Sequence, residues 1–174
     1  MKYFTTPIKT ALDMYRHRDQ YAYLYGAKGT KLNSRQDVLN FFAAEPGYFS
    51  KYTDAEKEQI IRNSVGKTAY DCSGFTGHCT GDMQWSTGQI NNCSVVTTPR
   101  DGVAGSLLYT TFGGKGRHIG LDIGYGYCLD MGYESTDAAV REQRDSVRLT
   151  RIAETAWEKS GRSRLIDYTG ATNL

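Results

Sequence analysis

The first third of the chain carries apolar residues at helical spacing. Residues 6–18 are predicted to form a short helix, because apolar side chains recur there three or four positions apart behind a proline. Two further helices are predicted from the capping-box pattern, in which a hydroxyl residue is followed three positions later by an acidic residue. These pairs are Ser34 with Asp37 and Thr53 with Glu56. The chain before residue 72 is therefore predicted to be helical, apart from an extended, tyrosine-rich piece at 21–26.

After about residue 104 the pattern changes to short runs of β type separated by glycine-rich turns. Strands are predicted at residues 106–112, 118–123, 127–131, 146–152 and 164–168. Gly124-Tyr125-Gly126 is predicted to be a tight hairpin connection, and the polar segment 81–103 to be a long loop. Helices followed by an antiparallel sheet are typical of the α+β class, and 174 residues fit one domain over 1–174.

The charge balance gives no reason to expect nucleic acid as a partner. The chain has 21 lysine and arginine residues against 19 aspartate and glutamate residues, a net charge of +2. A local basic excess in the second half would favour an anionic polymer. Its members are Lys115, Arg117, Arg141, Arg144, Arg148 and Arg151.

Targeting features and the number of cysteines indicate the cellular location and the redox state of the thiols that we expect. No stretch reaches the roughly 18 apolar residues of a membrane span, and the N-terminus lacks the apolar core of a signal peptide. We therefore expect either a protein that stays in the cytoplasm until it is released or a secreted mature fragment. The 4 cysteines do not form the pattern of a disulfide framework, so reduced thiols are expected.

Cys72 is the leading candidate nucleophile. It follows a polar turn and precedes Phe75 and Cys79, which share one face at helical spacing, so its sulfur is predicted to lie at the start of a helix. The positive end of the helix dipole favours the thiolate, which is the form that attacks a carbonyl carbon. The small residues Ser73 and Gly74 leave space for a substrate.

His118 is the leading candidate base among the three histidines. His17 lies between two arginines on a charged segment, and a helix would turn His78 away from Cys72. His118 begins a predicted strand, from which its imidazole can be presented to the sulfur of Cys72.

A catalytic base needs an orienting group, and two carboxylates compete for this role. If the predicted hairpin turns near Tyr125, residues whose numbers sum to about 250 are paired, which puts Asp130 opposite Gly120 and in diagonal contact with His118. Asp122 is the competitor, because it lies on the same strand face as His118.

Asp71-Cys72-Ser73-Gly74-Phe75, followed by His118-Ile-Gly-Leu-Asp-Ile-Gly, resembles the NlpC family of papain-like cell-wall peptidases. The separation of the two motifs, 118 − 72 = 46 residues, is typical of that family. The resemblance implies an α+β papain-like core at 21–168 behind an N-terminal helical segment at 1–20, with Cys72 as nucleophile and His118 as base. It places the third member twelve positions after the histidine, at Asp130, where the family usually has His, Asn or Gln. The implied partner is the peptide stem of peptidoglycan, and no cofactor or metal is implied.

The resemblance also implies substrate residues. Family members that cut between D-glutamate and a diamino acid bind the stem's free amine, and the matching residues here are Tyr23, Asp71 and Ser73. A phenol, a carboxylate and a hydroxyl can accept the three hydrogen bonds of an ammonium. For the oxyanion we expect the backbone N–H of Cys72 and a tyrosine hydroxyl, Tyr25 or Tyr23.

Two alternatives stay open. The same Cys and His pair supports amidase, transglutaminase or other acyl-transfer chemistry on related folds. A more remote alternative is a zinc-stabilised binding module that uses Cys72, His78, Cys79 and Cys93, although paired Cys-x-x-Cys knuckles are lacking. The sequence does not choose between a phage lysin, a secreted effector and a housekeeping wall enzyme, nor does it give the oligomeric state.

Overall fold

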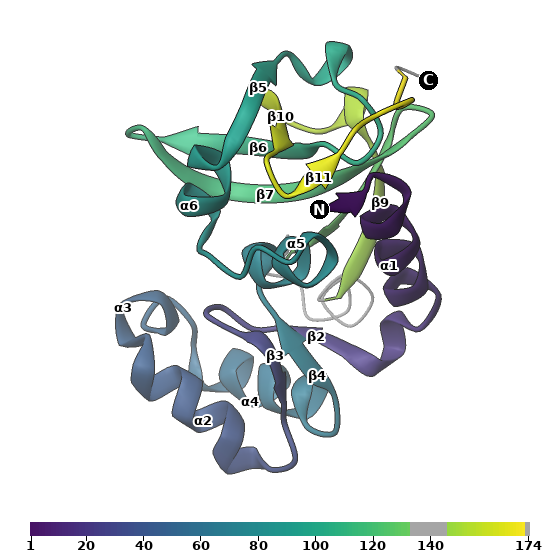
Figure 1. Ribbon diagram of the computed structural model, residues 1–174. Helices are drawn as coiled ribbons and strands as arrows, with labels where there is room; N and C mark the ends of the chain where they lie inside the picture. The colour runs from purple at the N-terminus through teal and green to yellow at the C-terminus, as the bar shows by residue number, and fades with distance from the viewer. Residues whose placement is uncertain (133–145, 173–174) are drawn as a thin grey trace.

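The computed structural model describes residues 1–132 and 146–172 (Figure 1). The helices are α1 (Thr5–Arg16), α2 (Arg35–Ala44), α3 (Pro46–Phe49), α4 (Asp54–Ser64), α5 (Cys72–Thr80) and α6 (Ser86–Asn91), with 3-10 turns η1 (Arg18–Gln20), η2 (Pro99–Asp101) and η3 (Ile152–Glu154). The strands are β1 (Lys2–Tyr3), β2 (Tyr21–Tyr23), β3 (Lys28–Lys31), β4 (Thr68–Tyr70), β5 (Cys93–Thr97), β6 (Leu107–Phe112), β7 (Lys115–Gly124), β8 (Tyr127–Met131), β9 (Val147–Arg151), β10 (Lys159–Ser163) and β11 (Ile166–Asp167).

A six-stranded antiparallel sheet in the order β5-β10-β6-β7-β8-β9 forms the centre of the fold. Helix α5 packs on this sheet and on α1, as Figure 1 shows. Phe75 and Cys79 of α5 are fully buried against Ile119 and Leu121 of β7. Burying such side chains stabilises the fold by about 1.5–3 kcal/mol each, so the helix that carries Cys72 is held firmly on the sheet. The predicted α+β class is confirmed.

The capping-box helices form where the sequence predicts them. Ser34 and Thr53 accept hydrogen bonds from the third backbone N–H groups of α2 and α4, and the side chains of Asp37 and Glu56 bond back to the caps. These two helices cover a second apolar cluster that includes Leu32, Val38 and Ile61. The reciprocal bonds satisfy N–H groups that a helix start otherwise leaves without a partner.

The prediction that the chain before Cys72 is helical, with one extended piece, is wrong in part. Strand β2 pairs in parallel with β4, and β4 pairs antiparallel with β3, which gives a small mixed sheet below α5 (Figure 1). Strand β3 is the sequence Lys-Gly-Thr-Lys and lies mostly exposed. Strands of three or four residues without an apolar run produce no periodic signal, so their pairing partner, far away in the chain, decides their structure.

The prediction of a loop at residues 81–103 is also wrong in part, since α6 and β5 form there. Gln89 is fully buried and holds α6 in place: its amide donates to the carbonyl oxygens of Ser73 at 2.7 Å and Gln84 at 2.9 Å, and it accepts from Thr76 at 2.8 Å. A buried amide with all these bonds replaces the apolar face by which a helix is normally recognised in a sequence.

The closing strands differ in position from the prediction at 164–168. Strand β10 ends at Ser163, and residues 166–167 form β11, which pairs in parallel with β1. The pairing of β11 with β1 and that of β10 with β5 join distant parts of the chain, which the local alternation of residues does not reveal. Among the described residues, no helix has the length and apolar character needed to cross a membrane.

Candidate active site

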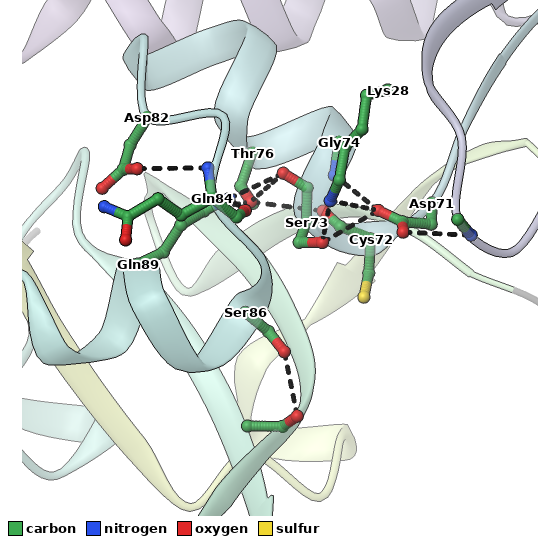
Figure 2. A network of polar contacts seen from close by, with 12 residues as sticks. Lys28, Asp71, Cys72, Ser73, Gly74, Thr76, Asp82, Gln84, Ser86 and Gln89 are labelled. Atoms are coloured by element: carbon green, nitrogen blue, oxygen red, sulfur yellow. Dashed lines mark hydrogen bonds and ion pairs between the residues drawn. The ribbon is translucent and has the colours of Figure 1, made fainter.

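Cys72 is the first residue of α5, as the sequence predicts. Asp71 caps the helix by accepting a hydrogen bond from the N–H of Gly74 at 2.6 Å, which Figure 2 shows. Gly74 lets the helix start approach the neighbouring segment closely, because a Cβ there would lie 2.4 Å from the carbonyl oxygen of Ala27. The sulfur of Cys72 points away from this network of bonds and is partly exposed (Figure 2).

The hairpin of β7 and β8 brings His118 and Asp130 together. Gly120 lies opposite Asp130 in this pairing, which confirms the predicted register. The Nε2–H of His118 donates to Oδ2 of Asp130 at 2.6 Å, and the side chain of Asp130 is only 2% exposed. The side chain of Cys72 lies near enough to His118 to contribute to the raised pKa of its imidazole. Cys72, His118 and Asp130 are thus neighbours at the start of α5.

The charges at the site favour the imidazolium form of His118. Burial alone would lower the pKa of His118, but the hydrogen bonds and charges of Asp130 and Cys72 outweigh it and raise this pKa to about 10. Burial pushes the pKa of Asp130 upward, and the hydrogen bonds from His118 and Arg148 overcome that effect, so its pKa lies below the ordinary value. An ionised carboxylate beside a protonated imidazole is the result.

Arg148 is a member of the site that sequence reasoning missed in this role. It lies opposite Asp130 in the pairing of β8 with β9, and its Nε and Nη2 donate to the two carboxylate oxygens at 2.9 and 2.5 Å. This bidentate arrangement fixes the carboxylate plane in space. The alternation of arginines along this strand is visible in the sequence, but its pairing with β8 is not.

Trp157 is the second missed residue. Its ring stacks on the imidazole of His118, with centroids 5.3 Å apart and planes inclined by 9°, and its N–H donates to Sγ of Cys128 at 3.2 Å. Gly120 provides the room, because a Cβ there would lie 3.0 Å from the indole. Trp157 therefore covers the face of His118 and limits its orientation.

Asp122, the competing carboxylate, does not meet His118 among the described contacts. Its Oδ1 accepts from the backbone N–H of Gly124 at 2.8 Å, and its side chain lines a different cavity. Of the two candidates, Asp130 is the one that the hairpin places beside His118.

A groove of about 890 Å³ opens beside His118 and Asp130. Its aromatic walls include Tyr23, Tyr25, Tyr48, Phe112 and Trp157, and its basic residues include Lys51, Lys115 and Arg117. Tyr25 stacks on Tyr48 with ring centroids 4.0 Å apart. Burial first, and then the neighbouring Tyr48 and Cys72, raise the pKa of Tyr23 well above its usual value, so this phenol keeps its proton and stays a donor. Arg141 and Arg144, which the sequence grouped with the basic residues, lie outside the described residues.

Asp71 and Ser73 already hold an ammonium group, that of Lys28. Lys28 Nζ lies 3.1 Å from Oδ1 of Asp71 and also donates to the hydroxyl of Ser73 (Figure 2). The same Nζ lies 4.4 Å from the ring centroid of Trp85. Asp71 and Ser73 are each 1% exposed. A substrate ammonium would have to displace Lys28 in order to reach them, which the sequence motif did not reveal.

The cysteines other than Cys72 lie in different surroundings. All four are free thiols, and burial raises the pKa of Cys79 to about 12 and that of Cys93 to about 11. His78 is hydrogen-bonded to the hydroxyl of Tyr70. No group of three or more metal-ligating side chains comes together within 1–132 and 146–172, so the zinc arrangement considered from the sequence is not assembled there.

Comparison with known proteins identifies the fold. No protein-family model and no curated protein matches the sequence. Among solved structures, the chain is similar to the peptidoglycan hydrolase RipB from Mycobacterium tuberculosis, with 17% identity, a TM-score of 0.52 and coverage of 95% of this chain and 67% of that chain. It is also similar to the P60 domain of an antigen from M. avium subspecies paratuberculosis, with 16% identity, a TM-score of 0.50 and coverage of 95% and 98%. The expected NlpC-type fold is confirmed, and at this identity the likeness establishes the fold alone.

Proposed function

We propose that this protein is a cysteine peptidase that hydrolyses an amide bond in the peptide stems of bacterial peptidoglycan, with Cys72 as nucleophile. The observation that carries the proposal is the arrangement at the helix start: His118 lies 2.6 Å from the buried Asp130, and the nearby Cys72 helps to raise the pKa of His118. The similar fold of a peptidoglycan hydrolase supports the choice of substrate. The proposed place of action is accordingly the cell wall.

The proposed reaction has two steps. The thiolate of Cys72 attacks the amide carbonyl carbon, and the imidazolium of His118 gives its proton to the leaving amine, which produces a thioester. Neutral His118 then takes a proton from the water that attacks the thioester, which releases the free acid and restores the thiolate of Cys72 and the imidazolium of His118. Because Asp130 engages Nε2, the proton exchanges at Nδ1.

Two kinds of donor are available for the oxyanion in this mechanism. The backbone N–H of Cys72 belongs to the first turn of α5, where N–H groups have no acceptor within the helix. Tyr23 and Tyr25 line the same groove as His118, and their pKa values are raised first by burial and also by the nearby Cys72, so both phenols remain protonated donors.

The groove favours an acidic peptide. Three acidic residues line it: Glu158 accepts two hydrogen bonds from Thr111, Asp130 is held by His118 and Arg148, and Glu154 lies 3.4 Å from Arg151. Within the described part of the chain, no carboxylate forms an ion pair with Lys115 or Arg117. These cations remain for the carboxylates of a stem peptide that contains D-glutamate and a diamino acid.

The D-glutamyl to diamino acid bond is the cleavage site that we propose. We infer that the stem is not selected by its free amine, because Lys28 already occupies Asp71 and Ser73. Stems with a free and with an acylated amino terminus should then be cut at similar rates. Mass spectrometry of digests of defined muropeptides tests this, and a strict requirement for the free amine would show that Lys28 is displaced.

The test of the nucleophile is Cys72→Ser, assayed by release of stem fragments from purified peptidoglycan. We expect loss of activity by a factor of about a thousand or more, because a serine hydroxyl remains protonated where a thiol ionises. Cys93→Ser is the matched control and should keep activity, since Cys93 is a partly buried thiol that is separate from the group of Cys72, His118 and Asp130. Cleavage by Cys72→Ser at the native rate would refute the proposal. The masses of the products distinguish hydrolysis, in which the cut peptide gains one water molecule, from acyl transfer, which is the alternative reaction.

A further inference from the structure

A second cavity of about 520 Å³ lies at the other end of β7 from His118. Asp122 on its wall is four residues beyond His118 along the strand, which corresponds to about 13 Å. Pro99 of η2, Ala104 and Ile152 of η3 provide apolar walls, and Gly124 and Gly126 of the β7–β8 turn also line it. The remaining lining residues are Thr98, Arg100, Gly102 and Ala153. Its chemistry therefore differs from that of the aromatic and basic groove.

The carboxylate of Asp122 lies in this apolar wall without a cation. Asp122 is only 5% exposed, and its Oδ1 accepts one hydrogen bond from the N–H of Gly124 at 2.8 Å. Among residues 1–132 and 146–172, no hydrogen bond or ion pair reaches its second oxygen. Arg100 lines the same cavity but forms no ion pair with Asp122 within those residues.

Burial shifts the pKa of the Asp122 carboxyl group. It raises the pKa of Asp122 to about 6, and the hydrogen bond from Gly124 lowers it only partly. Above pH 7 the carboxylate is therefore mostly ionised and remains uncompensated in a poorly solvated place, which is costly for the protein. A ligand that brings a positive charge and an apolar body would offset this cost.

We propose that this cavity binds a primary ammonium group carried on an apolar chain, with Asp122 as the anion that receives it. The apolar walls would cover the methylene groups, and the second oxygen of Asp122 would accept an N–H of the ammonium. Two sources share this chemistry: a free alkylamine and the side chain of a lysine or similar diamino acid in a peptide. The site is separate from the Cys72 centre, so the inference does not rest on the proposed function.

The test is calorimetric titration of the full chain with hexylammonium at about pH 7.5, where Asp122 is mostly ionised. We expect hexylammonium to bind about tenfold or more tightly than hexanol, and hexanoate to bind more weakly than either. A second arm compares Nα-acetyl-lysine methylamide with its norleucine analogue. Preference for the lysine compound over hexylammonium identifies a peptide side chain as the source, and the opposite preference identifies a free amine.

Asp122→Asn is the decisive variant, because asparagine can still accept the bond from Gly124 and so preserves the turn. It should weaken hexylammonium binding about tenfold and leave hexanol binding unchanged. Asp19→Asn removes an equal charge outside the cavity and should bind as the native chain does. Ala153→Phe, at the exposed edge of the cavity, should weaken the binding of both ligands.

Equal binding of hexylammonium by the native chain and Asp122→Asn, or a preference for hexanoate, would overturn the proposal. Cys72→Ser should keep full binding, which separates this result from any failure of the peptidase proposal.

Discussion

Asp130→Asn removes one buried charge while it keeps a hydrogen-bond acceptor beside His118. The carboxylate lies 2.6 Å from Nε2 of His118, and its side chain is 2% exposed. An opposite charge at this distance raises an imidazole pKa by about 1–3 units, so the pKa of His118 should fall from about 10 to about 7–9. At 1.36 kcal/mol per unit, the imidazolium loses about 1–4 kcal/mol of stabilisation.

The same substitution should change how stability depends on pH. The folded-state pKa of His118 lies above its ordinary value of 6.5, so its contribution to stability is fully present below pH 6.5 and is lost as the pH rises through about 10. Asp130→Asn should therefore lower the free energy of unfolding more at about pH 6 than at about pH 10. Arg148 loses its carboxylate partner at both pH values, so that cost cancels in the difference.

Carbon-13 labelling of the histidines lets NMR follow this titration without a substrate. His78 is an internal control, because burial and then the charge of Lys2 lower its pKa independently of Asp130. Asp122→Asn is the matched variant and should leave the titration of His118 unchanged. If His118 titrates at the same pH in Asp130→Asn as in the native protein, the carboxylate does not sustain the imidazolium and the reasoning is wrong.

Two further substitutions test the frame around the site. Gly74→Ala places a Cβ against a backbone carbonyl and should lower the free energy of unfolding by about 1–3 kcal/mol in urea titrations. Gly47→Ala, in open space on α3, should not destabilise the protein. Equal effects of the two substitutions would contradict the packing argument. Trp157→Leu removes the ring stacked on His118 and should reduce kcat by up to about tenfold with a smaller change in KM, while Trp157→Phe keeps most of the activity. A loss in Trp157→Leu that appears only in KM would instead assign this residue to substrate binding.

The local part of the site could be predicted because the position of a hairpin turn sets the strand register to within about one residue. Tyr125 and Gly126 adopt positive φ angles of 55° and 76°, and the turn they form pairs Gly124 with Tyr127. A register shift between Asp122 and Gly124 then pairs Gly120 with Asp130. Once that register is set, the diagonal contact between His118 and Asp130 follows from strand geometry alone. The helix start at Cys72 was equally readable, because an aspartate cap precedes small residues and an apolar face.

The remaining members of the site depend on pairings between distant segments. Arg148 reaches Asp130 through the pairing of β8 with β9, Trp157 reaches His118 from the connection that precedes β10, and Lys28 reaches Asp71 from β3. None of these contacts has a periodicity or a spacing in the sequence. For the same reason β3 and β4 were missed, since each is too short to show its own pattern.

The bonds of Asp71, Ser73 and Gly74 change what the cysteine motif can say about the substrate. Asp71 caps the helix, Ser73 donates to Asp71 at 2.9 Å, and Gly74 permits close backbone contact, so each residue has a structural task that needs no ligand. With Lys28 in the same cluster, the bonds of this motif are accounted for without an amine subsite. Under the proposed function, substrate choice then comes from the groove walls, which include aromatic rings and the cations Lys115 and Arg117. Since those walls come from several separate segments, we expect substitutions in them to change the bond that is cut while they leave the proposed nucleophile and base in place.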